Sequence, residues 1–208
     1  KPKNMIPDSL QVLHFEVNGV LFDMQRVEGG VFMMGRTREQ HRESISTDLP
    51  VHTIALDAYY MGRTEVTQAL WKAVMPEWVF VEDMNLPNFP MCYVSWYDCQ
   101  EFVRRLDSIT GLPFRLPTEA EWEFAARGGN KSLGYRFAGS NSPELVSWGL
   151  SNAGFRRHEV GRKLPNELGL YDMLGNVYEL CAHNSSQFSF FQMYCVSFIC
   201  NHFFFICI

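Results

Sequence analysis

The 208-residue sequence lacks the features of several protein classes. It contains no run of five or more Lys or Arg residues, and its net charge of −5 argues against nucleic acid as the main partner. None of its six cysteines forms a CxxC pair, which argues against a zinc knuckle. Charged residues make up 20% of the chain and hydrophobic residues 47%, a balance typical of globular proteins and not of disordered ones. The length predicts a single domain.

The sequence also lacks an initiating methionine, because it begins at Lys1. Two explanations stay open: a signal peptide has been removed, or a longer chain has been trimmed. We interpret residues 1–24 as a polar leader followed by the first strand of a hairpin.

Short alternating segments near the N-terminus predict β-strands. Asn18-Gly19 lies between two apolar segments and is the strongest short-range hairpin signal. Residues 31–34 predict another short strand, and the alternation over residues 51–60 predicts one further strand. Residues 36–48 are charged and irregular, which predicts an exposed loop between those two strands.

Helices are predicted further along the chain from their N-caps. Thr67, Ser95 and Thr118 each precede an apolar periodic segment, and an acidic residue follows three positions after two of them, at Asp98 and Glu121. These pairs are typical of the capping box, in which side chain and backbone at a helix start exchange hydrogen bonds. We expect the second helix to end at Gly111 and to bury Cys99, Phe102, Val103, Leu106 and Ile109.

Residues 130–161 are rich in Gly, Ser and Asn, with isolated aromatic residues among them. This composition predicts irregular loops held in place by single buried rings. A long irregular stretch in a compact domain is usually functional or is stabilised by something other than secondary structure. The stretch therefore favours a bound ion nearby.

An oxygen-rich segment follows at residues 169–180, with the sequence GLYDMLGNVYEL. Asp172 and Glu179 are carboxylates seven residues apart, and between them Gly175-Asn176 tolerates positive φ. A chain that turns there directs both carboxylates at one point, as a hard cation such as calcium requires. The alternative is a turn in which Asp172 caps its own backbone and Glu179 is solvated. No EF-hand spacing is present.

Three segments carry a family likeness: VEGGVFMMG at residues 27–35, RLPTEAEWEFAARGG at residues 115–129, and the segment at residues 169–179. Shorter matches lie between them in the expected order, namely Pro50-Val-His52, Glu65-Val-Thr67 and Val94-Ser-Trp96. Over about residues 25–180 the chain therefore resembles the formylglycine-generating enzyme (sulfatase-modifying factor) family.

This resemblance implies an α+β, C-type-lectin-like fold with little regular secondary structure. It also implies a calcium ion held partly by the side chains of Asp172 and Glu179 and by the backbone carbonyls of Gly175 and Val177. The resemblance and the pattern of carboxylates thus lead to the same cation.

The catalytic segment of the family is not recognisable. Enzyme members oxidise a cysteine of a client sulfatase to formylglycine, using oxygen and a copper-binding pair of cysteines that follows an Arg-Gly-Gly-Ser-type segment. That segment and the closing Gly-Phe-Arg strand are missing from the sequence, so no catalytic residue is assigned. The favoured hypothesis is a non-catalytic binding or structural module outside the cytoplasm, periplasmic, at the cell surface or secreted, with a protein or surface ligand as partner. The alternative is a formylglycine-generating oxidoreductase with an altered C-terminal segment, and only that alternative implies copper.

Residues 181–208 form an atypical apolar tail. After Glu179 the chain has no charged residue, no Gly and no Pro, but it has seven Phe and four Cys. We favour an aberrant, for instance frameshifted, C-terminus. A membrane anchor over residues 188–208 is long enough but is interrupted by polar residues, and divergent core strands are the third possibility.

Two pairs of cysteines leave alternatives open. Cys92 and Cys99 are either a short disulfide or two core thiols. Cys195 and Cys200 have a spacing that a thiol pair for copper can have, but nothing around them matches the family. We interpret them as incidental cysteines of an apolar tail.

Overall fold

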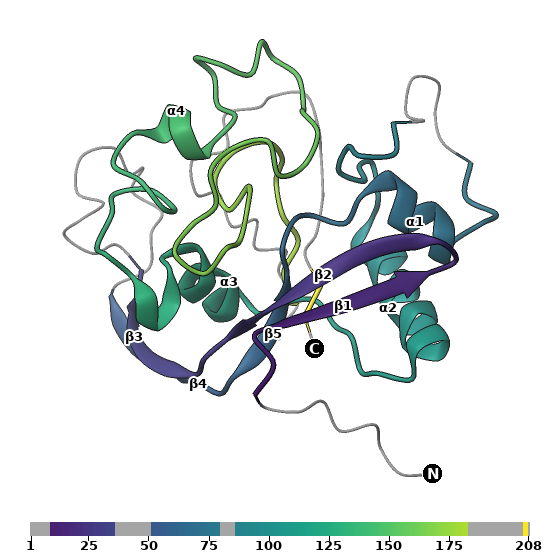
Figure 1. Cartoon of the computed structure of the whole chain (residues 1–208), viewed down its shortest axis with the longest axis horizontal. Coiled ribbons are helices and arrows are strands. Elements are labelled where there is room, and N and C mark those ends of the chain that lie inside the picture. The colour runs from purple at the N-terminus through teal and green to yellow at the C-terminus, as the bar shows by residue number, and fades with distance from the viewer. Residues whose placement is uncertain (1–8, 36–50, 80–85, 183–205, 208) are drawn as a thin grey trace.

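The computed structural model describes residues 9–35, 51–79, 86–182 and 206–207, and it combines two small antiparallel sheets with short helices and long loops (Figure 1). This architecture confirms the α+β class. The elements are β1 (Val12–Val17), β2 (Val20–Val27), β3 (Gly30–Met34), β4 (His52–Leu56), β5 (Tyr59–Gly62), α1 (Gln68–Val74), α2 (Trp96–Thr110), α3 (Glu119–Ala126), the 3₁₀-helix η2 (Gly129–Lys131) and α4 (Pro143–Val146).

The first sheet has the strand order β1-β2-β5. β1 and β2 form the predicted hairpin, in which Val17 pairs with Val20 across a two-residue turn. Asn18 and Gly19 have φ values of 49° and 82°, the left-handed conformation that a tight hairpin turn requires. β2 also pairs with β5 along its other edge. It continues from Val20 to Val27 without a break at residue 24, where we ended the N-terminal segment in the sequence analysis.

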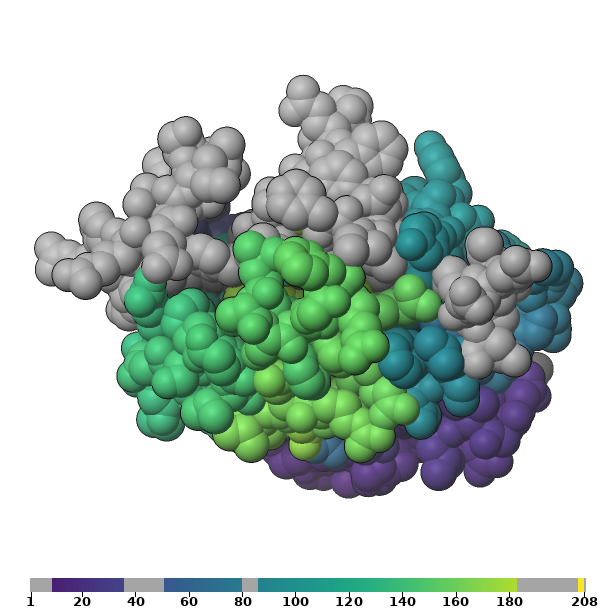
Figure 2. All heavy atoms as spheres, turned by 90° about the horizontal axis from the view of Figure 1, so that it is seen from above, coloured from purple at the N-terminus to yellow at the C-terminus, as the bar shows by residue number. Residues whose placement is uncertain are grey.

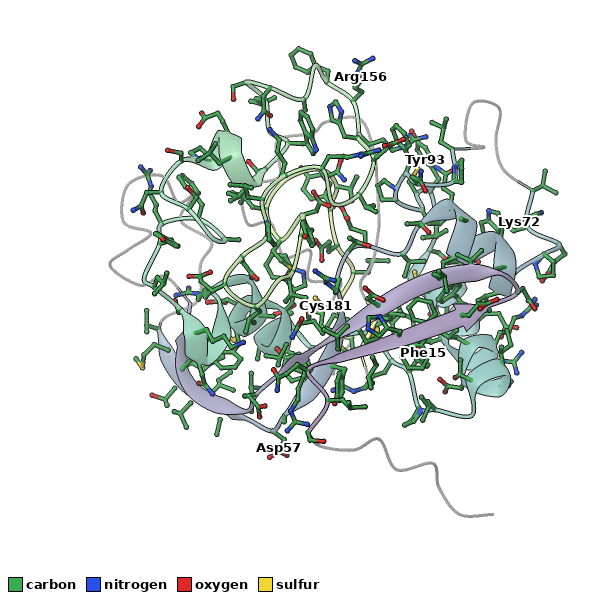
Figure 3. The ribbon with its side chains drawn as sticks, in the orientation of Figure 1. Phe15, Asp57, Lys72, Tyr93, Arg156 and Cys181 are labelled. Carbon is green, nitrogen blue, oxygen red and sulfur yellow. The ribbon has the colours of Figure 1, made fainter. Side chains whose placement is uncertain are left out.

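The expectation of one strand over residues 51–60 is wrong, because this segment contributes to two sheets. β4 pairs with β3 in the second sheet, whereas β5 pairs with β2 in the first. The chain changes sheet at Asp57, which lies at the lower edge of Figure 3. The residues of β4 are exposed or partly exposed, whereas all four residues of β5 are buried, and the sequence pattern of residues 51–60 did not reveal this change.

The helix starts agree with the capping predictions. The Thr67 hydroxyl accepts a hydrogen bond from the Leu70 N–H, and complete capping boxes are present at Ser95 and at Thr118. Gly111 ends α2 in the left-handed conformation with φ 74°. Ile109 contradicts its prediction, since it is 47% exposed. It lies in the last turn of α2, beyond the core, and lines a shallow groove beside the β1–β2 turn.

The hydrophobic core consists of two clusters. In the first, the rings of Trp71 and Phe102 stack with centroids 5.0 Å apart, beneath the β1–β2 hairpin. The second packs Trp122 and other residues of α3 against β5 and the segment around residues 168–173. Cys207 also belongs to the second cluster, and its backbone forms isolated antiparallel β-bridges with Met61 and with Arg115.

The cysteines in the described residues are buried, and none of them is part of a disulfide. They are Cys92, Cys99, Cys181 and Cys207. The disulfide alternative for Cys92 and Cys99 is therefore wrong, and the core-thiol alternative is confirmed. Cys195 and Cys200 lie outside the described residues, as does nearly all of the segment considered as a membrane anchor. No helix in the described part of the chain is long and apolar enough to cross a membrane.

Loops dominate the segment between α3 and residue 182. In Figure 1 they form the upper part of the molecule, above α3 and the first sheet, and in Figure 2 their green atoms occupy the centre of the face. Within residues 130–161, α4 and the end of η2 are the only helical pieces, and no strand is present. The prediction of an irregular stretch is confirmed.

The backbone at Gly29 lies against the backbone of residues 56–58, where the chain leaves one sheet and enters the other, and a substitution at Gly29 tests this contact. A Cβ atom at Gly29 would lie 2.6 Å from the Leu56 carbonyl oxygen and 2.9 Å from the Ala58 nitrogen, both of them backbone atoms. We expect Gly29→Ala to lower the free energy of unfolding by about 1–3 kcal/mol through overpacking. Gly149→Ala is the matched control, because a Cβ there meets no atom within 4 Å. Urea denaturation measures both, and equal effects would contradict the close approach.

Candidate functional site

The segment of residues 169–180 is a compact loop built on left-handed residues. Gly169, Asp172, Gly175 and Asn176 all have positive φ, with values of 83°, 55°, 80° and 53°. Glycine is required at Gly175, where a Cβ would overlap the carbonyl oxygen of Trp148. The predicted turn at Gly175-Asn176 is therefore present.

Both carboxylates of this loop point into the protein. Asp172 is 2% exposed, and its Oδ2 accepts a hydrogen bond of 2.6 Å from the backbone N–H of Gly161. Glu179 is 7% exposed, and its Oε2 accepts a hydrogen bond from the indole N–H of Trp122 on α3. The alternative of a solvated Glu179 is wrong.

A third buried carboxylate, Glu65, joins the site from the other end of the chain. It lies on the short link between β5 and α1 and is 2% exposed. Its Oε1 accepts a hydrogen bond of 3.0 Å from the side-chain amide of Asn176. We did not predict Glu65 as a site residue. In the sequence it was noted only as part of the short family match Glu65-Val-Thr67, in which Thr67 is the helix cap.

Asn176 holds these elements together. Besides its bond to Glu65, its amide N–H donates to the backbone carbonyl of His158 over 3.3 Å, and its Oδ1 accepts from the His158 N–H over 2.9 Å. The His158 ring stacks on Trp148 with centroids 3.8 Å apart, and Lys163 Nζ lies 3.9 Å from the centre of the Trp148 ring. His158 thus packs within the loop layer.

Burial is the largest cause that raises the pKa of each of the three carboxyl groups, and the charges of neighbouring carboxylates add to it for Glu65 and Glu179. Burial raises the pKa of Asp172 to about 6, although the Gly161 N–H, a hydrogen bond with Glu65 and the charge of Lys163 lower it. The pKa of Glu65 is raised well above its ordinary value by burial and then by the charges of Asp172 and Glu179. Burial, with a smaller contribution from Asp172, also raises the pKa of Glu179.

No compensating ion pair is present in the part of the chain that the structure describes. The salt bridges there do not include Glu65, Asp172 or Glu179. Glu65 Oε2 and Asp172 Oδ1 are buried and accept no hydrogen bond from a donor. Such unsatisfied acceptors are expensive unless a proton, a water molecule or a cation lies between them.

The donor set suits a hard cation. The predicted calcium ligands, Asp172, Glu179 and the carbonyls of Gly175 and Val177, are all oxygens. The Gly175 carbonyl already accepts a 2.6 Å hydrogen bond from the Val177 N–H, which leaves its second lone pair. Within the described ranges, no three His, Cys, Asp or Glu side chains are placed so that they could hold a metal ion. The predicted set uses only two side chains, so it stays a prediction.

The site lies at the centre of the molecule, close to Cys181. The thiol of Cys181 has its pKa raised by burial first and by the charge of Glu179 second. Figure 3 labels this residue between the hairpin and the upper loops, whereas Arg156 lies at the tip of those loops. The carboxylates are therefore an internal feature, and the outer loops form a separate surface.

Solved structures share this fold. Treponema denticola variable protein 1 superimposes with a TM-score of 0.73 over 96% of this chain and 99% of its own, at 24% identity. PvdO from Pseudomonas aeruginosa gives a TM-score of 0.66 over 89% of this chain and 93% of its own, at 20% identity. Together with the mixed architecture, these matches define a C-type-lectin-like fold.

Sequence comparison then identifies the family. The model of the sulfatase-modifying factor enzyme 1-like domain matches residues 14–196, so the chain belongs to this family. The chaperone protein LppX of Paenibacillus barcinonensis is 31% identical over 76% of this chain and 70% of its own length. The formylglycine-generating enzyme of Thermomonospora curvata is 35% identical over 56% of this chain and 40% of its own. A serine/threonine-protein kinase pkn1 of Chlamydia pneumoniae is 29% identical over 78% of this chain but only 28% of its own length.

The raised pKa of Asp172 predicts an unusual dependence of stability on pH. Because the folded protein binds this proton more tightly than the unfolded chain, the carboxyl group favours folding below its ordinary pKa of 3.8, and that contribution is lost as pH rises through about 6. In a chelating buffer, we expect the wild-type protein to lose about 2 kcal/mol relative to Asp172→Asn between pH 4 and pH 7. Urea unfolding of both proteins across this range measures the difference. A difference that does not change with pH would contradict the buried carboxyl group.

Proposed function

We propose that the chain is a non-catalytic binding or structural module of its family, working outside the cytoplasm, with its loop layer stabilised by calcium. The observation that carries this proposal is the buried group of carboxylates Glu65, Asp172 and Glu179, none of which forms a salt bridge with another described residue. A cation there would stabilise the loops without taking part in a reaction.

The relatives support a module with variable function. Their names are those of a chaperone, a formylglycine-generating enzyme and a protein kinase, and the chain spans 70%, 40% and 28% of their respective lengths. One scaffold thus occurs in proteins of different activity, as is common for widespread folds. The activities of the longer proteins are not carried over to this chain.

The outer loops offer a surface for a protein or another surface ligand. Phe155 is 62% exposed and Tyr93 is 50% exposed, and both have left-handed backbone conformations, with φ of 57° and 58°. Bulky residues rarely adopt this conformation, and such strain is more frequent at functional sites. In Figure 3, Tyr93 lies at the edge of the loop layer and Arg156, next to Phe155, lies at its tip.

Calcium would be held by the carboxylates of Asp172 and Glu179 and by the carbonyls of Gly175 and Val177. Bound calcium supplies positive charge to a buried cluster of carboxylates and fixes the backbone turn that places them. Asn176 and Trp122 orient the cluster through hydrogen bonds to Glu65 and Glu179. Extracellular calcium sites often bind in the millimolar range, which suits a protein outside the cytoplasm.

Calcium should raise the melting temperature of the wild-type protein. At a concentration about 100 times Kd, ligand linkage adds about 2.7 kcal/mol to the free energy of unfolding, equivalent to about 5–10 °C for a domain of this size. Asp172→Ala should abolish this rise, because it removes a side-chain ligand. Differential scanning calorimetry with calcium and with chelator measures the effect.

Two controls make the calcium result specific. Glu16 is exposed on β1, so Glu16→Gln removes one carboxylate without touching the site and should keep the full rise. Magnesium should give a smaller rise, since its octahedral geometry is more demanding. Identical wild-type melting curves in calcium and in chelator would overturn the calcium part of the proposal.

The oxidoreductase alternative is favoured by one observation, the 35% identity to a formylglycine-generating enzyme over 129 residues. Such an enzyme needs a soft thiolate pair for Cu(I). We expect the purified chain to bind no stoichiometric copper and to leave a sulfatase-motif peptide unmodified in air. Mass spectrometry of the peptide tests this, with an active formylglycine-generating enzyme as positive control. Loss of mass at the peptide cysteine would favour the enzyme over the module.

A further inference from the structure

The loop of residues 154–163 concentrates positive charge in a chain that is acidic as a whole. Its charged residues are Arg156, Arg157, Glu159, Arg162 and Lys163, so four of the five are cations. The net charge of the complete chain is −5. A local positive potential of this kind attracts the anionic groups of a partner and disfavours cationic ones.

Arg156 is the cation of this loop that stays available to a partner. Its side chain is exposed and forms neither a salt bridge nor a side-chain hydrogen bond with another described residue. In Figure 3 it lies at the outer tip of the loops. The other three cations contact groups of the protein itself, in the pairs Arg162–Glu159, Arg157–Phe89 and Lys163–Trp148.

Phe155 brings an aromatic ring to the same tip. Gly154 and Phe155 are both left-handed, with φ of 59° and 57°, and the Arg156 N–H donates to the Ala153 carbonyl over 3.3 Å. This tight turn presents an exposed ring and a guanidinium at adjacent positions. Aromatic residues and arginine are the residue types that contribute most of the binding energy in protein interfaces.

An uncharged segment, residues 86–97, lies beside the cationic loop. The Val160 N–H donates to the Asn88 carbonyl over 3.0 Å, and the Arg157 guanidinium lies 5.9 Å from the centre of the Phe89 ring. No charged residue occurs in this segment. Its exposed large apolar residues are Leu86, Tyr93 and Tyr97. The two neighbouring segments together therefore offer positive charge and apolar surface.

We infer that residues 154–163 and 86–97 form a surface that binds an acidic peptide segment of a protein partner, in which apolar side chains accompany the carboxylates. The inference deepens the binding module proposed above and rests on it, but it requires no calcium. A carboxylate of the partner pairs with the planar guanidinium of Arg156, and an apolar side chain of the partner contacts Phe155. Three of the four cations are engaged within the protein, so the surface suits such a peptide better than a sulfated polysaccharide.

Fluorescence anisotropy with a labelled peptide tests the surface. The probe is Glu-Phe-Glu-Asp-Leu-Glu with an N-terminal fluorescein, and its neutral analogue carries Gln and Asn in place of Glu and Asp. The wild-type protein should bind the probe at least about 10-fold more tightly than the analogue, because charge complementarity is lost in the analogue. Binding should weaken as NaCl rises from about 50 to 300 mM, since salt screens exposed charges.

Two variants locate the binding, and each has a matched control. Arg156→Glu should weaken the probe about 5- to 10-fold, whereas the same charge change at exposed Lys131 on η2, Lys131→Glu, should leave it unchanged. Phe155→Asn should weaken it about 10-fold, and asparagine tolerates the left-handed backbone there. Leu21→Asn removes another exposed apolar side chain, on β2, and should bind as the wild type does. Thermal melts check that all four variants fold.

The outcomes separate this inference from the proposed module. If the wild-type protein does not bind the probe, the inference is wrong, and a rise in melting temperature with calcium still supports the calcium-stabilised module. If the probe binds with the expected variant pattern but calcium has no effect, the inference stands and the calcium part of the module fails. Equal weakening by Arg156→Glu and Lys131→Glu indicates attraction to net charge alone and overturns the inference. Tighter binding of heparin than of the probe, lost in Arg156→Glu, also overturns it, because the partner is then a polysaccharide.

Discussion

Burial of Glu65, Asp172 and Glu179 together is the constraint that organises the loop half of the protein. Isolated charges in a protein interior cost several kcal/mol each, and like charges in contact cost more. The structure supplies one hydrogen-bond donor to each carboxylate, from Asn176, from the Gly161 backbone and from Trp122. These donors come from three different segments, so the carboxylates stay in place only if all three segments are correctly positioned.

The loops between α3 and residue 182 depend on such buried hydrogen bonds, because η2 and α4 are the only regular elements among them and few of their backbone groups are paired within a helix or sheet. Asn166 serves in the same way as Asn176: its amide N–H donates to the Ala125 carbonyl over 2.7 Å, and its Oδ1 accepts from the N–H groups of Leu168 and Leu170. Buried side-chain amides thus satisfy backbone groups that secondary structure would satisfy elsewhere. The carboxylate cluster extends this network to the first half of the chain.

Local signals in the sequence predicted the elements that depend on local interactions. The hairpin at Asn18-Gly19 and the capping boxes at Ser95 and Thr118 are encoded within a few residues, and the structure has each of them. The division of residues 51–60 into two strands was not predictable in this way. It depends on which distant strand each half pairs with, and nothing within residues 51–60 specifies that partner.

The candidate site shows the same limit. The turn at Gly175-Asn176, which the structure has, followed from residue types within one loop. Glu65 did not, because it bonds to Asn176 across 111 positions of sequence and neither segment specifies the other locally. Its burial was also hidden, since an acidic residue before a helix cap is ordinarily solvent-exposed.

The separation between the interior cluster and the outer surface explains how one scaffold can serve proteins with different activities. Trp148, His158 and the buried carboxylates fix the inner side of the loops through stacking and hydrogen bonds. Phe155 and Arg156 lie on the outer side and are exposed, so substitutions there do not disturb the anchors. A family built in this way can change its outer residues while the interior stays the same. In the module that we propose, the exposed loop residues decide what is bound, whereas the buried carboxylates decide whether those loops hold their shape.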